Sequence, residues 1–301
     1  DGKETIIHHA GIWIPFSRGV IRYSRRNNIP LIVCPHGMLE PWALNYKKLK
    51  KRIAWWAYQR SDLHCAQAFQ ACSLQEAESI RQLGFRQPIA VISNGVQLPT
   101  LNQSSVISNQ SSDQKTALFL SRINPKKGLL MLLDAWGKEA PLNWRLVIAG
   151  NDDSNYLPAV EERIRKLKLT ERVEISGPLY GEAKEAAFRR ADLFILPSHS
   201  ENFGIVVPEA LSYQVPVLTT TGCPWEELVA KGCGWQVEPT LVGISTGLRQ
   251  ALSTDLATRQ DMGVRGRLLV EGKYQWPSIA RDMLAFYEWL LGSRSKPHFV
   301  V

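Results

Sequence analysis

The feature that most restricts the fold of this chain is a repeated alternation of short apolar runs with helix-length segments. The runs are rich in Val, Ile and Leu and lie at residues 30–34, 89–93, 116–121, 145–150, 172–176, 192–197 and 215–220. A strand that is apolar along its whole length is typical of a parallel sheet, because helices cover both faces of such a sheet. Strand, helix and strand in repetition therefore predict an α/β protein with parallel sheets.

A polar stretch at residues 101–114 separates the early runs from the later ones and shows neither strand nor helix periodicity. Such a stretch is typical of a linker or an exposed loop. We therefore expect two α/β domains, at residues 1–98 and 99–275, and a last helix at residues 276–292 that packs back toward the first domain. Within the first domain, Ser73 as N-cap, Glu76 as its capping-box partner and Gly84 as the stop delimit one helix.

The composition is that of an ordinary globular protein. No apolar run among the 301 residues approaches the roughly 18 residues needed to cross a bilayer, and no signal peptide is recognisable, so we expect a cytoplasmic protein. The five cysteines form no CxxC pair, which predicts free thiols rather than a disulfide framework or a zinc knuckle. Because Asp1 is followed almost at once by a strand-like run, we expect that the sequence lacks an upstream part.

The positive charge is concentrated in the first third of the chain. Residues 1–99 hold 13 Lys and Arg against 6 Asp and Glu, although the net charge of the whole chain is only +8. Residues 42–60 are the focus: they predict a helix with lysines on one side and five apolar residues in helical spacing on the other, namely Trp42, Tyr46, Leu49, Ile53 and Trp56. This helix could lie on an anionic membrane surface or pack into the core with a solvated basic face. Nucleic acid is not expected as a partner, because no recognised module accompanies the basic patch.

Ligands of α/β sheets bind beyond the carboxyl ends of the strands, and three strand ends carry candidate residues. After residues 116–121 come Arg122 and Lys127, two cations suited to a diphosphate, although a solvated turn closed by Gly128 is the alternative. After residues 30–34 comes His36, a lone histidine of the kind that is often structural. No P-loop and no GxGxxG motif is present.

The third strand end is followed by "SENFGIVVPEA" at residues 200–210. A helix that starts near Gly204 would hold Pro208 in its first turns and present the open amides of residues 204–207 to an anion. Glu201 and Glu209 would bracket that anion and accept hydrogen bonds from hydroxyls, as a nucleotide sugar requires. The alternative is that Glu201 is an exposed loop acid and Glu209 only a partner of the helix dipole.

Several motifs in order resemble the GT-B glycosyltransferases of family 4, the "glycosyl transferases group 1", of the type that builds bacterial cell-surface polysaccharides. They are "HHAGIW", "PHGMLEPWAL", "KKRIAWW", "CSLQEAESIRQLGF", "VISNGV", "SRINPKKG" and "SENFGIVVPEALSYQVPVLTT", and the resemblance covers nearly all of residues 6–292. It implies two Rossmann-like domains that face a cleft, the first of them incomplete, because the family begins with a strand and a glycine-containing loop that are absent here.

The resemblance also implies roles for individual residues. Arg122 and Lys127 would hold the diphosphate and stabilise the leaving group, and Glu209 would bind the ribose. Glu201 and His36 would contact the donor sugar from the two domains. The remaining donor-binding positions would be Gly150, Leu179, Asn202, Phe203, Gly204 and Ile205.

The implied reaction is a retaining transfer of a sugar from a UDP or GDP sugar to a glycan or a lipid-linked acceptor, by same-face attack. Neither a metal nor a cofactor is expected, since no DxD motif occurs and Asp152 and Asp153 are adjacent. The enzyme would work in cell-surface polysaccharide or lipopolysaccharide synthesis, at the inner face of the plasma membrane. The alternatives are a non-catalytic nucleotide-sugar-binding or scaffold protein and, with less support, an epimerase or phosphorylase on the same fold.

Overall fold

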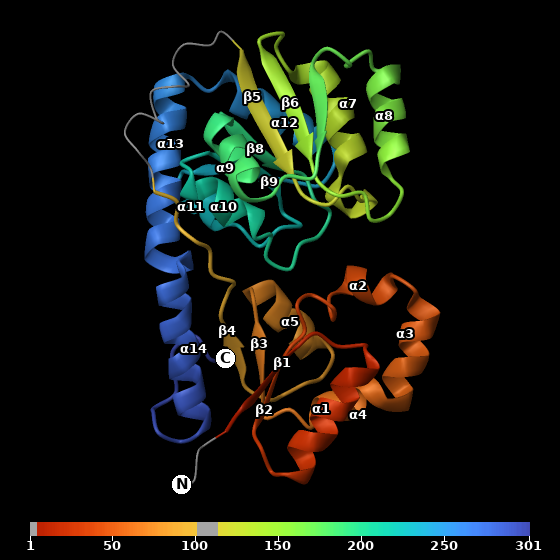
Figure 1. The fold of residues 1–301 in the computed structure, drawn as a ribbon, viewed down its shortest axis with the longest axis vertical. Coiled ribbons are helices and arrows are strands. Elements are labelled where there is room, and N and C mark those ends of the chain that lie inside the picture. The colour runs from red at the N-terminus through yellow and green to blue at the C-terminus, as the bar shows by residue number, and fades with distance from the viewer. Residues whose placement is uncertain (1–4, 101–113) are drawn as a thin grey trace. The chain divides into compact units, whose positions relative to one another are not determined.

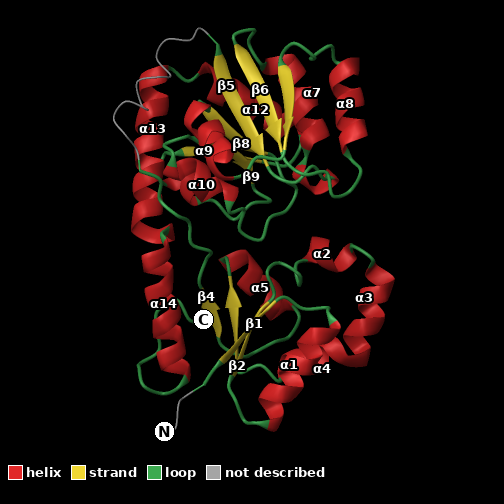
Figure 2. Cartoon of the chain, in the orientation of Figure 1, coloured by secondary structure: helices red, strands yellow, loops and turns green. Residues whose placement is uncertain are grey.

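The computed structural model describes residues 5–100 and 114–301 and divides the chain into two compact units. The first comprises the residues up to Gly95 together with Trp276–Val301, and the second is Val96–Gln275. Each is built on one parallel sheet (Figures 1 and 2). The division lies within a few residues of the expected boundary at residue 98, whereas the expected linker falls, except for Gln114, outside the described residues.

The sheet of the first unit has four parallel strands in chain order: β1 (Ile7–Ala10), β2 (Leu31–Cys34), β3 (Ala68–Ala71) and β4 (Ile89–Val91). Successive side chains of a strand point to opposite faces. Leu31 and Val33 accordingly enter one apolar cluster, and Ile32 enters another on the opposite face. The apolar run at residues 30–34 is continuous because both faces of β2 are covered.

Two sets of helices cover this sheet. The cluster on one face includes side chains of α1 (Pro15–Arg26) and α5 (Leu74–Gln82), and that on the other face includes Ile279 and Phe286 of α14 (Trp276–Leu290). The C-terminal helix thus belongs to the first unit, where Figure 1 shows it in blue beside β4. The expected signals of α5 are present: the Ser73 hydroxyl accepts from Glu76 N at 3.1 Å, and Gly84 follows the helix with φ +88°.

The expectation of one continuous helix at residues 42–60 is wrong. The segment forms α2 (Pro41–Asn45), α3 (Lys48–Ala54) and a π-helical turn (Trp55–Gln59), followed by α4 (Arg60–His64). The break comes at Lys47, whose φ of +53° is left-handed and cannot continue a right-handed helix. The five apolar side chains in helical spacing also do not enter the core: Trp42, Tyr46, Leu49, Ile53 and Trp56 are 41% to 73% exposed. Leu44 and Trp55 of the same segment do pack against the core.

The sheet of the second unit has six parallel strands in the order β10-β9-β8-β5-β6-β7. Their bounds are β5 (Lys115–Leu120), β6 (Trp144–Ala149), β7 (Val173–Gly177), β8 (Leu193–Leu196), β9 (Val217–Thr220) and β10 (Gly234–Val237). From β5 the chain moves to β6 and β7 on one side, and from β8 it moves to β9 and β10 on the other. The strand order therefore reverses between β5 and β8, which is where ligands bind in sheets of this kind.

Helices cover both faces of the second sheet (Figure 1). On one face lie α7 (Leu129–Glu139), α8 (Leu157–Lys166) and α12 (Leu241–Ser253), with α12 packed on α7. On the other face lie α9 (Gly181–Arg190) and α10 (Val206–Ser212), of which α10 packs on β8, β9 and α13 (Leu256–Leu269). The short α11 (Glu227–Ala230) and a π-helical turn (Val270–Tyr274) complete the unit. In the described part of the chain, no helix combines the length and the apolar character needed to span a membrane.

Candidate active site

The loops after β5 and β8 meet at the point where the strand order reverses. His199 N donates to Lys126 O at 2.8 Å, and a Cβ on Gly128 would lie only 2.2 Å from Pro197 O. A residue larger than glycine would push the two loops apart, and its φ of +70° also favours glycine. The close approach brings the side chains of the two loops within reach of each other.

Lys127 and Glu201 form a buried ion pair across these loops. Lys127 Nζ donates to Glu201 Oε1, and the two residues are 7% and 8% exposed. The Ser198 hydroxyl donates to the same carboxylate oxygen at 2.6 Å. Lys127 ends a short 3₁₀ helix (Pro125–Lys127), whose N-cap Asn124 accepts from Lys126 N at 3.0 Å. The interpretation of Glu201 as an exposed loop acid is therefore wrong.

Glu209 lies in the first turn of α10 and is paired with a residue that sequence reasoning missed. Lys184 Nζ, from α9, donates to Glu209 Oε1 at 2.7 Å. The other carboxylate oxygen, Oε2, is buried and has no hydrogen-bond partner among the described residues. A buried acceptor without a donor is costly, so this oxygen is well placed to accept a hydrogen bond from a ligand. Nothing in the spacing of "GEAKEAAF" singles out Lys184, because only the packing of α9 beside α10 brings it to Glu209.

The segment between Glu201 and α10 is held by its own core contacts. The Phe203 ring is buried against Trp225 and Tyr274, with ring centroids 5.2 and 5.7 Å away, and Trp225 Nε1 donates to the Phe203 carbonyl. Gly204 has φ +75° and α10 begins two residues later, at Val206. The amide of Val207 donates to Gly204 O at 2.8 Å, so the expectation that all amides of residues 204–207 are open is wrong for Val207. Asn202 is half-buried and Ile205 is exposed, beside this fixed segment.

The remaining candidate donor-binding residues lie along the same edge of the sheet. Gly150 follows β6, and a Cβ there would lie 1.8 Å from Ser121 O, next to the exposed Arg122. Gly150 N donates in turn to Gly177 O, at the end of β7, at 2.9 Å. The half-buried Leu179 lies in the loop that leads from β7 into α9. All the candidate donor-binding residues thus lie at the carboxyl-end edge of one sheet.

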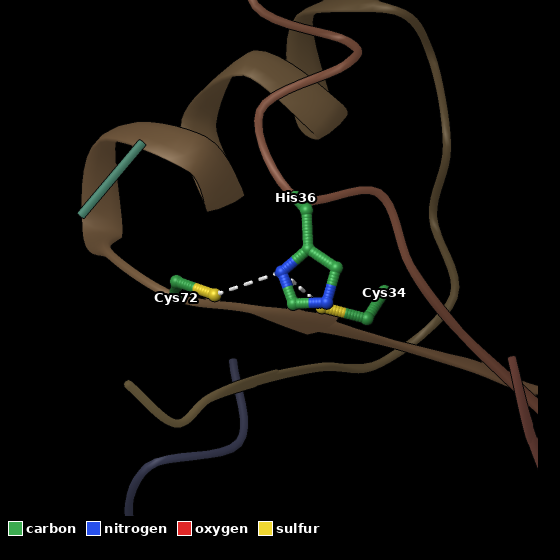
Figure 3. Close-up of side chains that lie close together, drawn as sticks. All are labelled: Cys34, His36 and Cys72. Atoms are coloured by element: carbon green, nitrogen blue, oxygen red, sulfur yellow. Dashed lines mark hydrogen bonds between the residues drawn. The ribbon is translucent and has the colours of Figure 1, made fainter. Parts of the chain in front are cut away.

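His36 belongs to the first unit, at the carboxyl end of β2. Its φ is +50°, and its ring nitrogen Nδ1 lies 3.6 Å from the Sγ atoms of both Cys34 and Cys72 (Figure 3). The hydrogen bond with Cys72 raises the pKa of His36, and the hydrogen bond with Cys72 and burial raise the pKa of Cys34. Burial and the neighbouring Cys72 raise the pKa of Glu76 to about 7. The predicted free thiols are confirmed, but the sequence does not indicate that two of them adjoin His36, because positions 34 and 72 are far apart in the chain and match no local spacing rule.

Two family models match the chain. "Glycosyl transferases group 1" matches residues 102–268, more than half of the chain, and "Glycosyltransferase Family 4" matches residues 5–98. A phosphatidyl-myo-inositol mannosyltransferase of Mycobacterium leprae is 29% identical over 271 residues, which are 86% of this chain and 64% of that protein. A mannosylfructose-phosphate synthase of Agrobacterium fabrum is 26% identical over 58% of this chain and 40% of its own length. The chain thus spans less than two thirds of the length of these curated relatives.

Solved structures show the same fold. Sucrose-phosphate synthase from Thermosynechococcus elongatus superposes with a TM-score of 0.80 at 21% identity, over 96% of this chain and 74% of that one. The Anabaena protein HepE in complex with UDP gives a TM-score of 0.77 at 20% identity, over 94% of this chain and 79% of that one. Two parallel-sheet α/β units and these matches together place the chain in the GT-B fold, and it belongs to the group 1, family 4 glycosyltransferases.

Proposed function

We propose that the chain forms the donor-binding part of a retaining glycosyltransferase that uses a UDP or GDP sugar without a metal at the diphosphate. The observation that carries the proposal is the set of buried charges at the reversal of strand order: the Lys127–Glu201 pair and the unpartnered Oε2 of Glu209. These groups offer one cation and two carboxylates at the edge where a ligand of such a sheet binds. A nucleotide sugar has the matching chemistry, with phosphates between two hydroxyl-bearing rings.

The proposed roles follow from where each side chain lies. Lys127 and the exposed Arg122 would bind the diphosphate and stabilise the charge that develops on the leaving phosphate. Glu209 would accept a ribose hydroxyl at Oε2, and Glu201 would accept a hydroxyl of the donor sugar. The acceptor hydroxyl would attack from the face that the phosphate leaves, with a departing phosphate oxygen as its base.

Binding of nucleoside diphosphates tests the donor site. UDP, GDP and ADP are titrated by calorimetry into the full chain and into the variants Lys127→Ala and Glu209→Ala. We expect UDP or GDP to bind and each variant to weaken binding at least about tenfold, or about 1.4 kcal/mol. Lys138→Ala is the matched control, because Lys138 is exposed in the last turn of α7 and its replacement removes the same charge.

Equal affinity of the wild-type chain and the two site variants would contradict the donor-site assignment. Incubation with the preferred donor and analysis by mass spectrometry then separates the activities. Transfer or donor hydrolysis supports the enzyme, whereas binding without either supports the binding-only alternative. The anomeric configuration of the product, read by NMR, tests retention.

We further propose that residues 42–60 attach the enzyme to an anionic membrane that carries a lipid-linked acceptor. Five large apolar side chains of this segment are exposed beside its lysines, which favours the membrane-surface interpretation over core packing. The name of the M. leprae relative also includes a phosphatidyl lipid. Polysaccharide or lipopolysaccharide synthesis on the cytoplasmic side is the setting that fits both features.

Vesicle binding tests this second proposal. We expect the chain to sediment with vesicles containing phosphatidylglycerol, less so at high salt, and not with phosphatidylcholine alone. The variant Lys47→Gln/Lys48→Gln/Lys50→Gln should lose much of this binding. Lys51 is left intact, because its Nζ donates to Ala43 O at 2.5 Å and holds the segment together. The control changes three exposed basic residues of α1 to Gln: Arg22, Arg25 and Arg26. Equal loss in both triple variants would indicate a nonspecific effect of net charge.

A further inference from the structure

The first unit holds a compact group of metal-ligating side chains outside the donor site. Cys34 ends β2, His36 follows it by two residues, and Cys72 follows the neighbouring strand β3. One ligand atom from each residue, Sγ, Nδ1 and Sγ, lies within 4.8 Å of the other two. Figure 3 shows the Cys72 sulfur beside the imidazole ring and the Cys34 sulfur behind it, with a dashed line from each to Nδ1.

Hydrogen bonding to the imidazole accounts for only one of the two sulfur contacts of Nδ1. Both sulfur atoms lie 3.6 Å from the single atom Nδ1. An imidazole nitrogen carries either one proton or one lone pair, so it can make one good hydrogen bond and not two. An ion bound to that lone pair can be shared with both sulfur atoms.

The two sulfur–nitrogen distances match those of a tetrahedral thiolate and imidazole site. Zinc lies about 2.3 Å from sulfur and about 2.0 Å from nitrogen, which at a tetrahedral angle separates the sulfur and nitrogen ligands by about 3.5 Å. Both sulfur–nitrogen separations are 3.6 Å. Sulfur ligands select zinc and other soft ions over magnesium and calcium, which prefer oxygen.

A buried carboxylate holds the two ligand-bearing loops in place. Glu76 is fully buried, and its two oxygens accept from Gly37 N at 2.5 Å and from Cys72 N at 2.7 Å. One side chain thus fixes the residue after His36 and the backbone of Cys72. Supporting groups of this kind orient the ligands of metal sites.

The accessibility of the ligands also suits a metal. Cys34 and Cys72 are 1% and 3% exposed, whereas His36 is exposed and leaves a route from solvent. Among the residues that the structure describes, no fourth His, Cys, Asp or Glu joins the group. Three protein ligands and one position for an outside ligand are typical of open zinc sites.

We propose that Cys34 Sγ, Cys72 Sγ and His36 Nδ1 bind one Zn²⁺ ion, with the fourth position left to water or another small ligand. This site is built from residues of the first unit alone, shares none with the proposed diphosphate site, and departs from the expectation that the protein holds no metal. Because only Nδ1 is used, Nε2 of His36 keeps its own capacity for a hydrogen bond. The proposal therefore stands whether or not the proposed transferase activity is found.

Cobalt serves as the spectroscopic probe for this site. The full chain is reduced, freed of metal with a chelator and titrated with CoCl₂. We expect a thiolate-to-cobalt charge-transfer band in the near ultraviolet and strong visible bands of a tetrahedral ion, saturating at one ion per chain. Addition of one equivalent of Zn²⁺ should remove both.

Variants then identify the ligands. Cys72→Ser should remove much of the charge-transfer band, and His36→Asn, which tolerates the left-handed backbone, should weaken Zn²⁺ binding while leaving the thiolate band in place. Glu76→Gln should weaken Zn²⁺ binding about 10- to 100-fold, as loss of a supporting group typically does. Cys65→Ser is the matched control, because Cys65 lies in the same unit outside the group and should leave the spectrum unchanged.

Three results would overturn the proposal. They are the absence of the charge-transfer band in the wild-type chain, the same band in Cys72→Ser as in wild type, and an equal loss in Cys65→Ser. A Cys34–Cys72 disulfide that persists in the reduced protein by peptide mapping would overturn it as well. Circular dichroism distinguishes a loss of folding from a loss of metal ligands. His36→Asn in addition changes an exposed side chain that the core does not require.

Discussion

Breaking the Lys127–Glu201 pair should strongly destabilise the second unit. In Lys127→Met the chain keeps a side chain of similar length but leaves the Glu201 carboxylate, 8% exposed, with the Ser198 hydroxyl and without its cation. Removing one partner of a buried ion pair typically costs about 3–5 kcal/mol, because the remaining charge stays in a poorly solvated place. Glu201→Gln should cost a similar amount, since it leaves the buried Lys127 ammonium without its carboxylate.

The double variant separates the charge effect from a loss of packing. Lys127→Met/Glu201→Gln contains neither buried charge, so its free energy of unfolding should lie well above the value expected from adding the two single losses. We expect an interaction energy of at least about 2 kcal/mol between the two sites, at the upper part of the range seen for contacting residues. Arg165→Met is the matched control, because the Arg165–Glu162 pair is exposed, with side chains 68% and 43% accessible. It should cost less than about 1 kcal/mol.

Hydrogen exchange measured by mass spectrometry is the suitable assay, because it reports on each unit within the full chain. The slowest amides of β5 and β8 give the opening free energy of the second unit, and those of β2 and β3 give that of the first. Only the opening free energy of the second unit should change in the variants. A loss in Lys127→Met no larger than that in Arg165→Met, or a double variant equal to the sum of the singles, would refute the argument that this pair is buried and coupled.

Two further predictions concern backbone contact and pH. Gly150→Ala should destabilise the second unit by about 1–3 kcal/mol or more, because the new Cβ would lie 1.8 Å from Ser121 O. Gly137→Ala should instead stabilise helix α7 by about 0.5–1 kcal/mol, because the atom nearest to its new Cβ is 3.8 Å away. Urea unfolding measures both, and equal effects would contradict the clash. Burial lowers the pKa of His9 below its ordinary value of 6.5, and its Nε2 lies 2.7 Å from the Ser17 hydroxyl. The neutral ring thus stabilises the fold above that value, and this contribution is lost as pH falls through the lowered pKa. His9→Gln should flatten the acid loss of stability, and parallel pH curves for variant and wild type would argue against it.

Most strands were predictable from the sequence for a physical reason, but β3 and β10 were missed, because Gln70 and Gln236 interrupt their apolar residues. Strands of a parallel sheet are buried on both faces, so β2 and β8 appear as unbroken apolar runs that differ from everything around them. Helix α5 was predictable because its first turn depends on a local capping contact. Residues 42–60 were misjudged because spacing alone does not reveal a single left-handed residue, Lys47, or whether any element covers an apolar stripe.

The candidate site was predictable only in part. Lys127 and Glu201 could be expected together because the carboxyl ends of parallel strands lie along one edge of a sheet. That β5 and β8 are neighbours depends on the order of strands, which the apolar runs do not encode. For the same reason Lys184 and the Cys34, His36 and Cys72 group were missed, since each depends on elements that are adjacent only in the folded chain.

The pairing of Lys127 with Glu201 bears on which ligand suits the site. A diphosphate that takes the Lys127 ammonium must leave Glu201 with another hydrogen-bond donor, because a buried carboxylate that loses its cation is costly. Phosphate oxygens at neutral pH are acceptors and cannot fill that role, whereas the hydroxyls of a sugar can. Glu209 also requires a hydrogen-bond donor from the ligand, because its buried Oε2 has none among the described residues. A ligand with anionic oxygens in its middle and hydroxyls at both ends satisfies all three groups together, and it does so better than a free nucleoside diphosphate, which leaves the Glu201 carboxylate with only the Ser198 hydroxyl.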